Sequence, residues 1–278
     1  MPIAKVNGTE LYYERQGSGE PLLLIPGLGL DHSYYRLAEP LLRSHVETVG
    51  IDLRGIGQSR KDLAEYTAEL WADDLAALIV ELGLGSAHVL GSSLGGTIAL
   101  AMGVRHPDKV RSLTIVGGFS EITRSVELNY ALRKKLIAKI GMGEELAEFM
   151  GLWIMTREFV DSEEGHKVFE ASKANVKKNS PELYVRFLDS ILRLGRRQPG
   201  EAIPPLTAAI NQITAPTLVL CADNDHFIPA SLSKLIAERV PGSRYLEIPG
   251  GGHIPFIEKP KESVGAVVQF IRSLASVH

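Results

Sequence analysis

Residues 91–95 read G-S-S-L-G and match the G-x-S-x-G pattern, in which a serine lies on a sharp turn between a strand and a helix. A short apolar run over residues 87–90 precedes the pattern, and apolar residues at helical spacing follow from Thr97. Such a turn strains the backbone of its central residue, so the positions two residues away on either side lack side chains. The strain holds the hydroxyl clear of the sheet, above the positive end of the following helix. The pattern therefore predicts Ser93 as a nucleophile and Ser92 as a spacer.

Two loops late in the chain supply the other groups that a serine nucleophile needs. A serine hydroxyl reacts poorly at neutral pH without a general base, and a carboxylate must orient that base. Residues 222–229 (A-D-N-D-H-F-I-P) and residues 249–255 (P-G-G-G-H-I-P) each follow a short predicted strand. His253 lies in the glycine-rich second loop and is the expected base, whereas either Asp223 or Asp225 is able to orient it. The order Ser, Asp, His along the chain is the order that accompanies this kind of serine turn.

The predicted elements form a sheet that places these loops at one edge. Strands alternate with helices in the first and last parts of the chain, which predicts one mostly parallel α/β sheet flanked by helices. Between them, residues 121–205 show only helical spacing, so we expect an inserted all-helical cap. The chain is thus divided into a core of residues 1–120 and 206–278 and a cap of residues 121–205. Residues 34–42 also have helical spacing, and Pro40 is expected to end that helix early.

Composition limits the classes of partner. The chain has 278 residues, of which 45% are hydrophobic and 23% charged, as in ordinary globular proteins. A net charge of −3 gives no broad basic face, so we expect no nucleic-acid partner. Residues 82–104 lack charged side chains, but their six glycines fit a buried strand and a packed helix better than a membrane span. No signal segment is evident, and one cysteine, Cys221, suits a reducing cytoplasm.

Further motifs accompany the serine turn. Residues 26–29 read P-G-L-G, residues 52–59 read D-L-R-G-I-G-Q-S, residues 225–229 read D-H-F-I-P, and residues 252–253 read G-H. With these motifs the chain resembles the α/β-hydrolase superfamily. It is most similar to the small cap-bearing group of carboxylesterases, enol-lactonases, cofactor-free haloperoxidases and carbon–carbon bond hydrolases. The resemblance covers most of the chain outside the cap. Many members have His-Gly where this chain has P-G at the start of residues 26–29.

The resemblance implies an α/β-hydrolase sheet with an inserted helical cap, and neither cofactor nor metal. It favours Asp225 as the acid, because similar hydrolases carry this carboxylate four residues before a proline. The N–H of Leu94, directly after the nucleophile at the helix start, is expected to be one donor of an oxyanion hole. The resemblance assigns the other donor to the N–H of Leu28. It also implies that Arg54 is a structural residue, which we expect to be buried and held by backbone carbonyls.

The cap carries several bulky side chains, most of which are expected to pack its helices together. One or two of them are expected to line an apolar pocket, and we select Trp153 as the candidate substrate-binding residue. The others are Phe149, Met150, Met155 and Phe187.

These features predict a cytoplasmic serine hydrolase that cleaves carboxylic esters of small molecules through an acyl-enzyme on Ser93. The same three groups would serve an enol-lactone, or a meta-cleavage product hydrolysed at a carbon–carbon bond. An alternative of another class is a ligand receptor with the hydrolase fold, which signals through movement of the cap. The sequence leaves these alternatives and the oligomeric state open.

Overall fold

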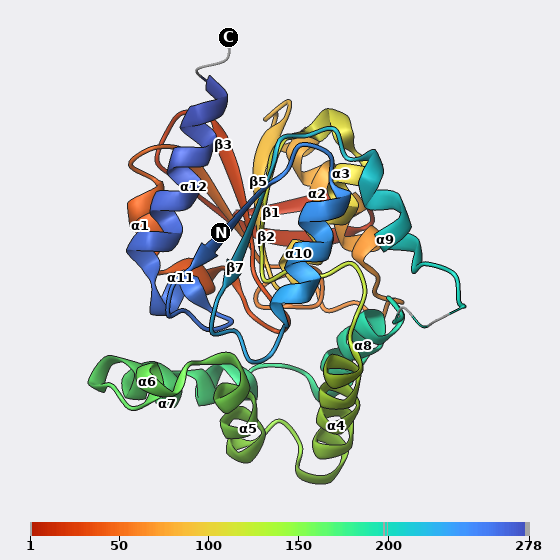
Figure 1. Ribbon diagram of the computed structural model, residues 1–278, viewed down its shortest axis with the longest axis vertical. Coiled ribbons are helices and arrows are strands. Elements are labelled where there is room, and N and C mark those ends of the chain that lie inside the picture. Colours follow the sequence, from red (N-terminus) through yellow and green to blue (C-terminus); the bar gives the residue numbers. More distant parts are fainter. Residues whose placement is uncertain (1, 197, 199, 276–278) are drawn as a thin grey trace.

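The computed structural model describes residues 2–196, 198 and 200–275, whose arrangement Figure 1 shows. Within these residues, a sheet of eight strands has the order β1-β2-β4-β3-β5-β6-β7-β8. Neighbouring strands from β4 onward in this order are parallel, whereas β2 is antiparallel to both β1 and β4. The strands are β1 (Ile3–Val6), β2 (Thr9–Gln16), β3 (Pro21–Ile25), β4 (Glu47–Ile51), β5 (Ala87–Ser92), β6 (Val110–Val116), β7 (Thr217–Ala222) and β8 (Arg244–Ile248).

Helices cover both faces of the sheet (Figure 1). Those on one face are α2 (Ala68–Glu81), α3 (Leu94–Arg105) and α10 (Ala230–Arg239). Those on the other face are α1 (Glu39–Leu42), α11 (Pro255–Glu258) and α12 (Pro260–Ala275), together with the 3-10 helix η1 (His32–Tyr35). No helix in the described part of the chain is long and apolar enough to cross a bilayer. The predicted fold class, a mostly parallel sheet flanked by helices, is confirmed.

Strand β3 shows why the centre of this sheet is so apolar. Leu22 and Leu24 belong to the buried cluster under α12, whereas Leu23 and Ile25 belong to the cluster under α2 and α3. A parallel strand with helices on both faces has no side exposed to water, so every position is apolar rather than every second one.

The expectation that Pro40 ends a helix over residues 34–42 is wrong. Residues in this stretch form two short elements instead, η1 and α1, and Pro40 is the second residue of α1. Proline fits the first turn of a helix because the N–H groups there have no partner within the helix.

The described residues between β6 and β7 contain helices and connecting loops but no strand. The helices are α4 (Arg124–Ile140), α5 (Glu144–Ile154), α6 (Arg157–Val160), α7 (Glu163–Lys177), α8 (Pro181–Leu192), α9 (Pro205–Ala209) and the 3-10 helix η3 (Ile210–Gln212). Helices α4 to α8 lie beyond one end of the sheet, below it in Figure 1. The Ile122 N–H donates to the Gly195 carbonyl oxygen at 2.9 Å, so the chain enters and leaves this helical segment at one place. The division into core and cap at residues 121 and 205 remains a prediction.

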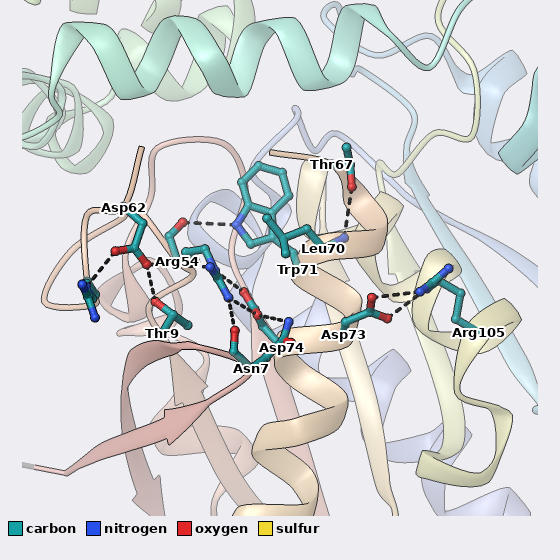
Figure 2. A network of polar contacts seen from close by, with 11 residues as sticks. Asn7, Thr9, Arg54, Asp62, Thr67, Leu70, Trp71, Asp73, Asp74 and Arg105 are labelled. Atoms are coloured by element: carbon teal, nitrogen blue, oxygen red, sulfur yellow. Dashed lines mark hydrogen bonds and ion pairs between the residues drawn. The ribbon is translucent and has the colours of Figure 1, made fainter. Parts of the chain in front are cut away.

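A buried ion pair ties the loop after β4 to α2 (Figure 2). Arg54 is 7% exposed, and its Nε and Nη2 atoms donate to the two carboxylate oxygens of Asp74 at 2.8 and 2.6 Å. Its Nη2 atom also donates to the Asn7 carbonyl oxygen at 2.8 Å, and the Asp74 carboxylate raises the pKa of Arg54. The residue is buried as expected, but a carboxylate holds it in addition to a backbone carbonyl.

We expect Asp74→Ala to lower the free energy of unfolding by about 3–5 kcal/mol, because it removes the bidentate partner of a buried guanidinium. Only the more distant Asp62 carboxylate, 3.7 Å from Arg54 Nη1, then remains as a counter-charge. Asp73→Ala is the matched control on the same helix. Asp73 pairs with Arg105 (Figure 2) and with His106, and all three side chains are partly exposed, so the loss should stay at about 1 kcal/mol or less. Urea titration followed by tryptophan fluorescence measures both. Equal losses would show that the buried Arg54 pair contributes no more to the free energy of unfolding than an exposed pair does.

Candidate active site

The turn between β5 and α3 holds Ser93 in a strained conformation, with φ 56° and ψ −119°. Positive φ at a non-glycine residue costs about 1–3 kcal/mol and persists only where the surroundings fix it. The Ser93 N–H donates to the Val116 carbonyl oxygen at 2.8 Å, which fixes the turn against β6. A Cβ atom on Gly91 would overlap the Gly95 carbonyl group, and one on Gly95 would overlap the Ile25 carbonyl oxygen. Both glycines of the pattern are therefore needed for close packing.

The structure brings together Ser93, His253 and Asp225, which follow β5, β8 and β7. The Nε2 atom of His253 lies 2.8 Å from Ser93 Oγ, and its Nδ1 atom lies 2.7 Å from Asp225 Oδ2. All three side chains are buried. In this arrangement an imidazole is able to take the proton of a serine hydroxyl while a carboxylate holds the ring in the required tautomer.

Of the two candidate carboxylates, Asp225 is the one beside the imidazole. Its second oxygen, Oδ1, accepts from the backbone N–H groups of Phe227 and Ile228 at 2.9 and 2.8 Å, which fixes the carboxylate. The Asp223 carboxylate turns away and accepts from the Gly250 N–H at 2.7 Å, so it joins two loops.

The loop that carries His253 is bonded to the end of α5 and the start of α6. The His253 N–H donates to the Ile154 carbonyl oxygen at 2.9 Å, and Thr156 Oγ1 donates to Glu258 Oε2 at 2.8 Å. Burial raises the pKa of Glu258, and the hydrogen bond from Thr156 opposes this effect. A Cβ atom on Gly252 would lie 2.5 Å from Glu258 Oε1, so any larger residue there would require the Glu258 carboxylate to shift. No sequence motif pointed to Thr156 or Glu258.

The two expected oxyanion donors both lie next to the serine. Leu94 is the first residue of α3, directly after Ser93. Leu28 follows Gly27, on which a Cβ atom would lie only 3.3 Å from Ser93 Cβ. Among the described residues, no group accepts a hydrogen bond from the N–H of Leu28 or Leu94. Both N–H groups are therefore available to a negatively charged oxygen.

A cavity of about 680 Å³ lies beside this site. Leu28 lines it, as do Ile254, which follows His253, and Tyr34, whose hydroxyl lies 3.1 Å from Ser92 Oγ. The helical segment contributes mainly apolar side chains, among them Met150, Ile154, Met155, Val176 and Tyr184. A largely apolar cavity of this size suits a small organic molecule.

The structure does not bring Trp153 to this cavity. The residue is 41% exposed and packs against Phe149, with ring centroids 6.5 Å apart. One step along a helix turns a side chain by about 100°, so Met150 and Ile154 face the cavity while Trp153 does not.

Two tyrosines that the sequence did not single out do line the cavity. Tyr34 lies in η1 and Tyr184 in α8, and no motif surrounds either of them. Burial raises the pKa of both hydroxyl groups above the usual range for tyrosine. Both hydroxyl groups contact protein atoms: that of Tyr34 lies 3.1 Å from Ser92 Oγ, and that of Tyr184 donates to Met150 Sδ at 3.7 Å. Within the described ranges, no group of three or more His, Cys, Asp or Glu side chains is arranged to hold a metal ion.

The sequence profile of the alpha/beta hydrolase family matches residues 22–266, which is most of the chain. The chain therefore belongs to the α/β-hydrolase family. It is 28% identical over 255 residues to the Azorhizobium caulinodans protein named "Putative carbamate hydrolase RutD", and the match covers 91% of each chain. The enol-lactonase from Burkholderia xenovorans LB400 is 25% identical, with a TM-score of 0.86 over 98% of this chain and 100% of its own. A thermophilic esterase from Thermogutta terrifontis is also 25% identical, with a TM-score of 0.84 over 98% and 99%. Family and relatives support a hydrolytic role.

We expect Asp225→Asn to slow covalent labelling of Ser93 by an organophosphonate on the order of 10⁴-fold, because the amide favours the wrong imidazole tautomer. Asp223→Asn is the matched control in the same loop and should slow labelling less than about tenfold, since its bond to Gly250 is structural. Mass spectrometry over time gives both rates, and circular dichroism checks the fold. The reverse order of effects would identify Asp223 as the orienting acid.

Proposed function

We propose that the protein is a serine hydrolase that cleaves carboxylic esters of small molecules. In this proposal Ser93 is the nucleophile, His253 the general base and Asp225 the group that orients it. The observation that carries the proposal is the continuous pair of hydrogen bonds from Ser93 Oγ through the imidazole to Asp225, 2.8 and 2.7 Å long.

The reaction then takes two steps on one set of residues. His253 Nε2 accepts the proton of Ser93 Oγ as that oxygen bonds to the ester carbonyl carbon. The resulting tetrahedral intermediate collapses, the carbon–oxygen bond to the alcohol breaks, and the imidazolium returns its proton to the leaving alcohol. Water next attacks the acyl-enzyme with the same base, which releases the carboxylic acid and restores the Ser93 hydroxyl.

The N–H groups of Leu28 and Leu94 are proposed to stabilise the oxyanion of both tetrahedral intermediates. Their value comes from being fixed in place before the charge develops, so that little reorganisation opposes the reaction. Residues 121–205 act in this proposal as the cap. They close the 680 Å³ cavity over the ester and keep bulk water away from the acyl-enzyme.

Two other classes of substrate would use the same site. The likeness to the Burkholderia xenovorans enol-lactonase favours an intramolecular ester as a second candidate substrate. The same steps apply, but the leaving oxygen stays attached to the acyl group, so deacylation releases a single ring-opened product. A carbon–carbon bond of a meta-cleavage product is a further substrate for the same groups. A receptor would differ in kind, since it would keep its ligand rather than release it.

A fluorophosphonate should label one residue per chain, and peptide mapping should locate the label on Ser93. Ser93→Ala should remove nearly all ester turnover, on the order of 10⁶-fold, since residues of such a triad act as a unit. Ser92→Ala is the neighbouring control and should still be labelled. A label on another residue, or turnover by Ser93→Ala, would refute the assignment.

Turnover separates an enzyme from a receptor. We expect steady hydrolysis of short-chain 4-nitrophenyl esters at roughly 1 per second or faster, with many equivalents of product released per chain. Mixing the protein with a small excess of ester and following 4-nitrophenol gives the result directly. Release of one equivalent followed by silence would favour the receptor, because the acyl group would then remain bound.

A further inference from the structure

The buried face of α4 carries two polar side chains with atoms that have no hydrogen-bond partner. Asn129 is 7% exposed and Arg133 only 3% exposed. In the part of the chain that the structure describes, neither the oxygen nor the nitrogen of the Asn129 amide has a hydrogen-bond partner, and the Nε and Nη2 atoms of Arg133 have none either. Residues four apart on a helix are neighbours on one face, so these unpaired groups form a single cluster.

A buried guanidinium normally has a counter-charge, because desolvation of an unpaired ion is costly. Among the described residues, no ion pair includes Arg133. Its Cζ atom lies instead 4.5 Å from the centre of the Phe227 ring and 5.3 Å from that of Tyr130. Ring faces attract the positive charge, but they provide no acceptor for N–H groups that point along the guanidinium plane.

The unpaired side of Arg133 is the side that this protein uses elsewhere to bind carboxylates. Arg54 grips Asp74 through Nε and Nη2, and Arg105 grips Asp73 through the same two atoms (Figure 2). Two parallel N–H groups match the two oxygens of a carboxylate, which makes this a strong and directional contact. In Arg133 that side is buried and unpaired.

The cluster adjoins the proposed active site. The Phe227 ring that stacks on Arg133 meets the His253 imidazole edge-on, with ring centroids 5.1 Å apart. Arg133 also contacts Tyr184, which lines the cavity: burial raises the pKa of the Tyr184 hydroxyl overall, while the charge of Arg133 and a hydrogen bond from it both lower that pKa. Nε and Nη2 remain the unpaired atoms of the guanidinium. One aromatic ring therefore separates the guanidinium from the base that would activate Ser93.

We propose that Arg133, with Asn129, binds a carboxylate carried by the substrate, so that the preferred esters are half-esters of dicarboxylic acids or similar anionic esters. This proposal rests on the proposed function and names its substrate class. The substrate carboxylate accepts from Nε and Nη2 of Arg133 and from the Asn129 amide nitrogen. It supplies the counter-charge that no described residue provides.

The test compares two esters of equal size. They are the 4-nitrophenyl half-ester of adipic acid and its carboxamide analogue, which lacks the charge. We expect wild type to favour the anionic ester in kcat/KM, and Arg133→Met to lower the ratio of anionic to neutral ester by about 10- to 100-fold. Arg133→Lys should recover part of the ratio, since it keeps the charge without the fork. Arg124→Met is the control, because it removes one charge from the exposed start of the same helix and should leave the ratio unchanged.

A second experiment measures by calorimetry how tightly adipate binds to Ser93→Ala. It tests the carboxylate contact without turnover and with Arg133 intact. Adipate should bind at least about tenfold more tightly than adipamide. Equal binding of the two, or an equal fall in both kcat/KM values in Arg133→Met, would overturn the proposal and leave Arg133 as a packing residue. If wild type hydrolyses neither ester, the proposed function fails. The adipate measurement still shows whether Arg133 binds a carboxylate.

Discussion

The positive φ angle of Ser93 is the constraint on which the site depends. The turn between β5 and α3 is sharp only because Gly91 and Gly95 let the backbone groups touch, and because β6 holds the Ser93 N–H. The cost of this strain is met by its surroundings: β3 and β5 are buried on both faces, so the turn cannot relax without disturbing the centre of the sheet. The hydroxyl is thus presented at a fixed point, and the loops after β7 and β8 bring the imidazole and carboxylate to it.

Helices α4 to α8 are part of the site and more than a cover for it. The Ile154 carbonyl holds the backbone of His253, Met150 and Tyr184 form walls of the cavity, and Arg133 stacks on the ring that meets the imidazole. Under the proposed function, loops at one edge of the sheet would provide the reacting groups, and the helical segment would provide the surroundings that distinguish one substrate from another. This division explains how relatives at 25–28% identity carry the names of different hydrolytic activities on one fold.

The sequence predicted what local backbone geometry requires. Glycines flanking a serine, apolar runs without alternation, and loops after strands are each readable within a few residues, so the sheet and the three grouped side chains could be expected. The partners of residues that lie far apart in the chain could not be predicted in this way. Arg133 lies between Tyr130 and Ile137 on the apolar stripe of α4, and this charged break in an apolar pattern is the one sequence signal that marks it as unusual. Its contact with Phe227 could not be predicted, because Phe227 is far away in the chain. Trp153 lies away from the cavity for a related reason, because aromatic character does not determine which face of a helix a residue occupies.

The hydrogen bond between Ile122 and Gly195 has an evolutionary consequence. Because the chain enters and leaves helices α4 to α8 at one place, these helices could be exchanged by recombination without changing the order of strands. The bond from His253 to Ile154 limits that freedom. A transplanted segment would have to offer a carbonyl oxygen at the same point in space, or the imidazole loop would lose its support.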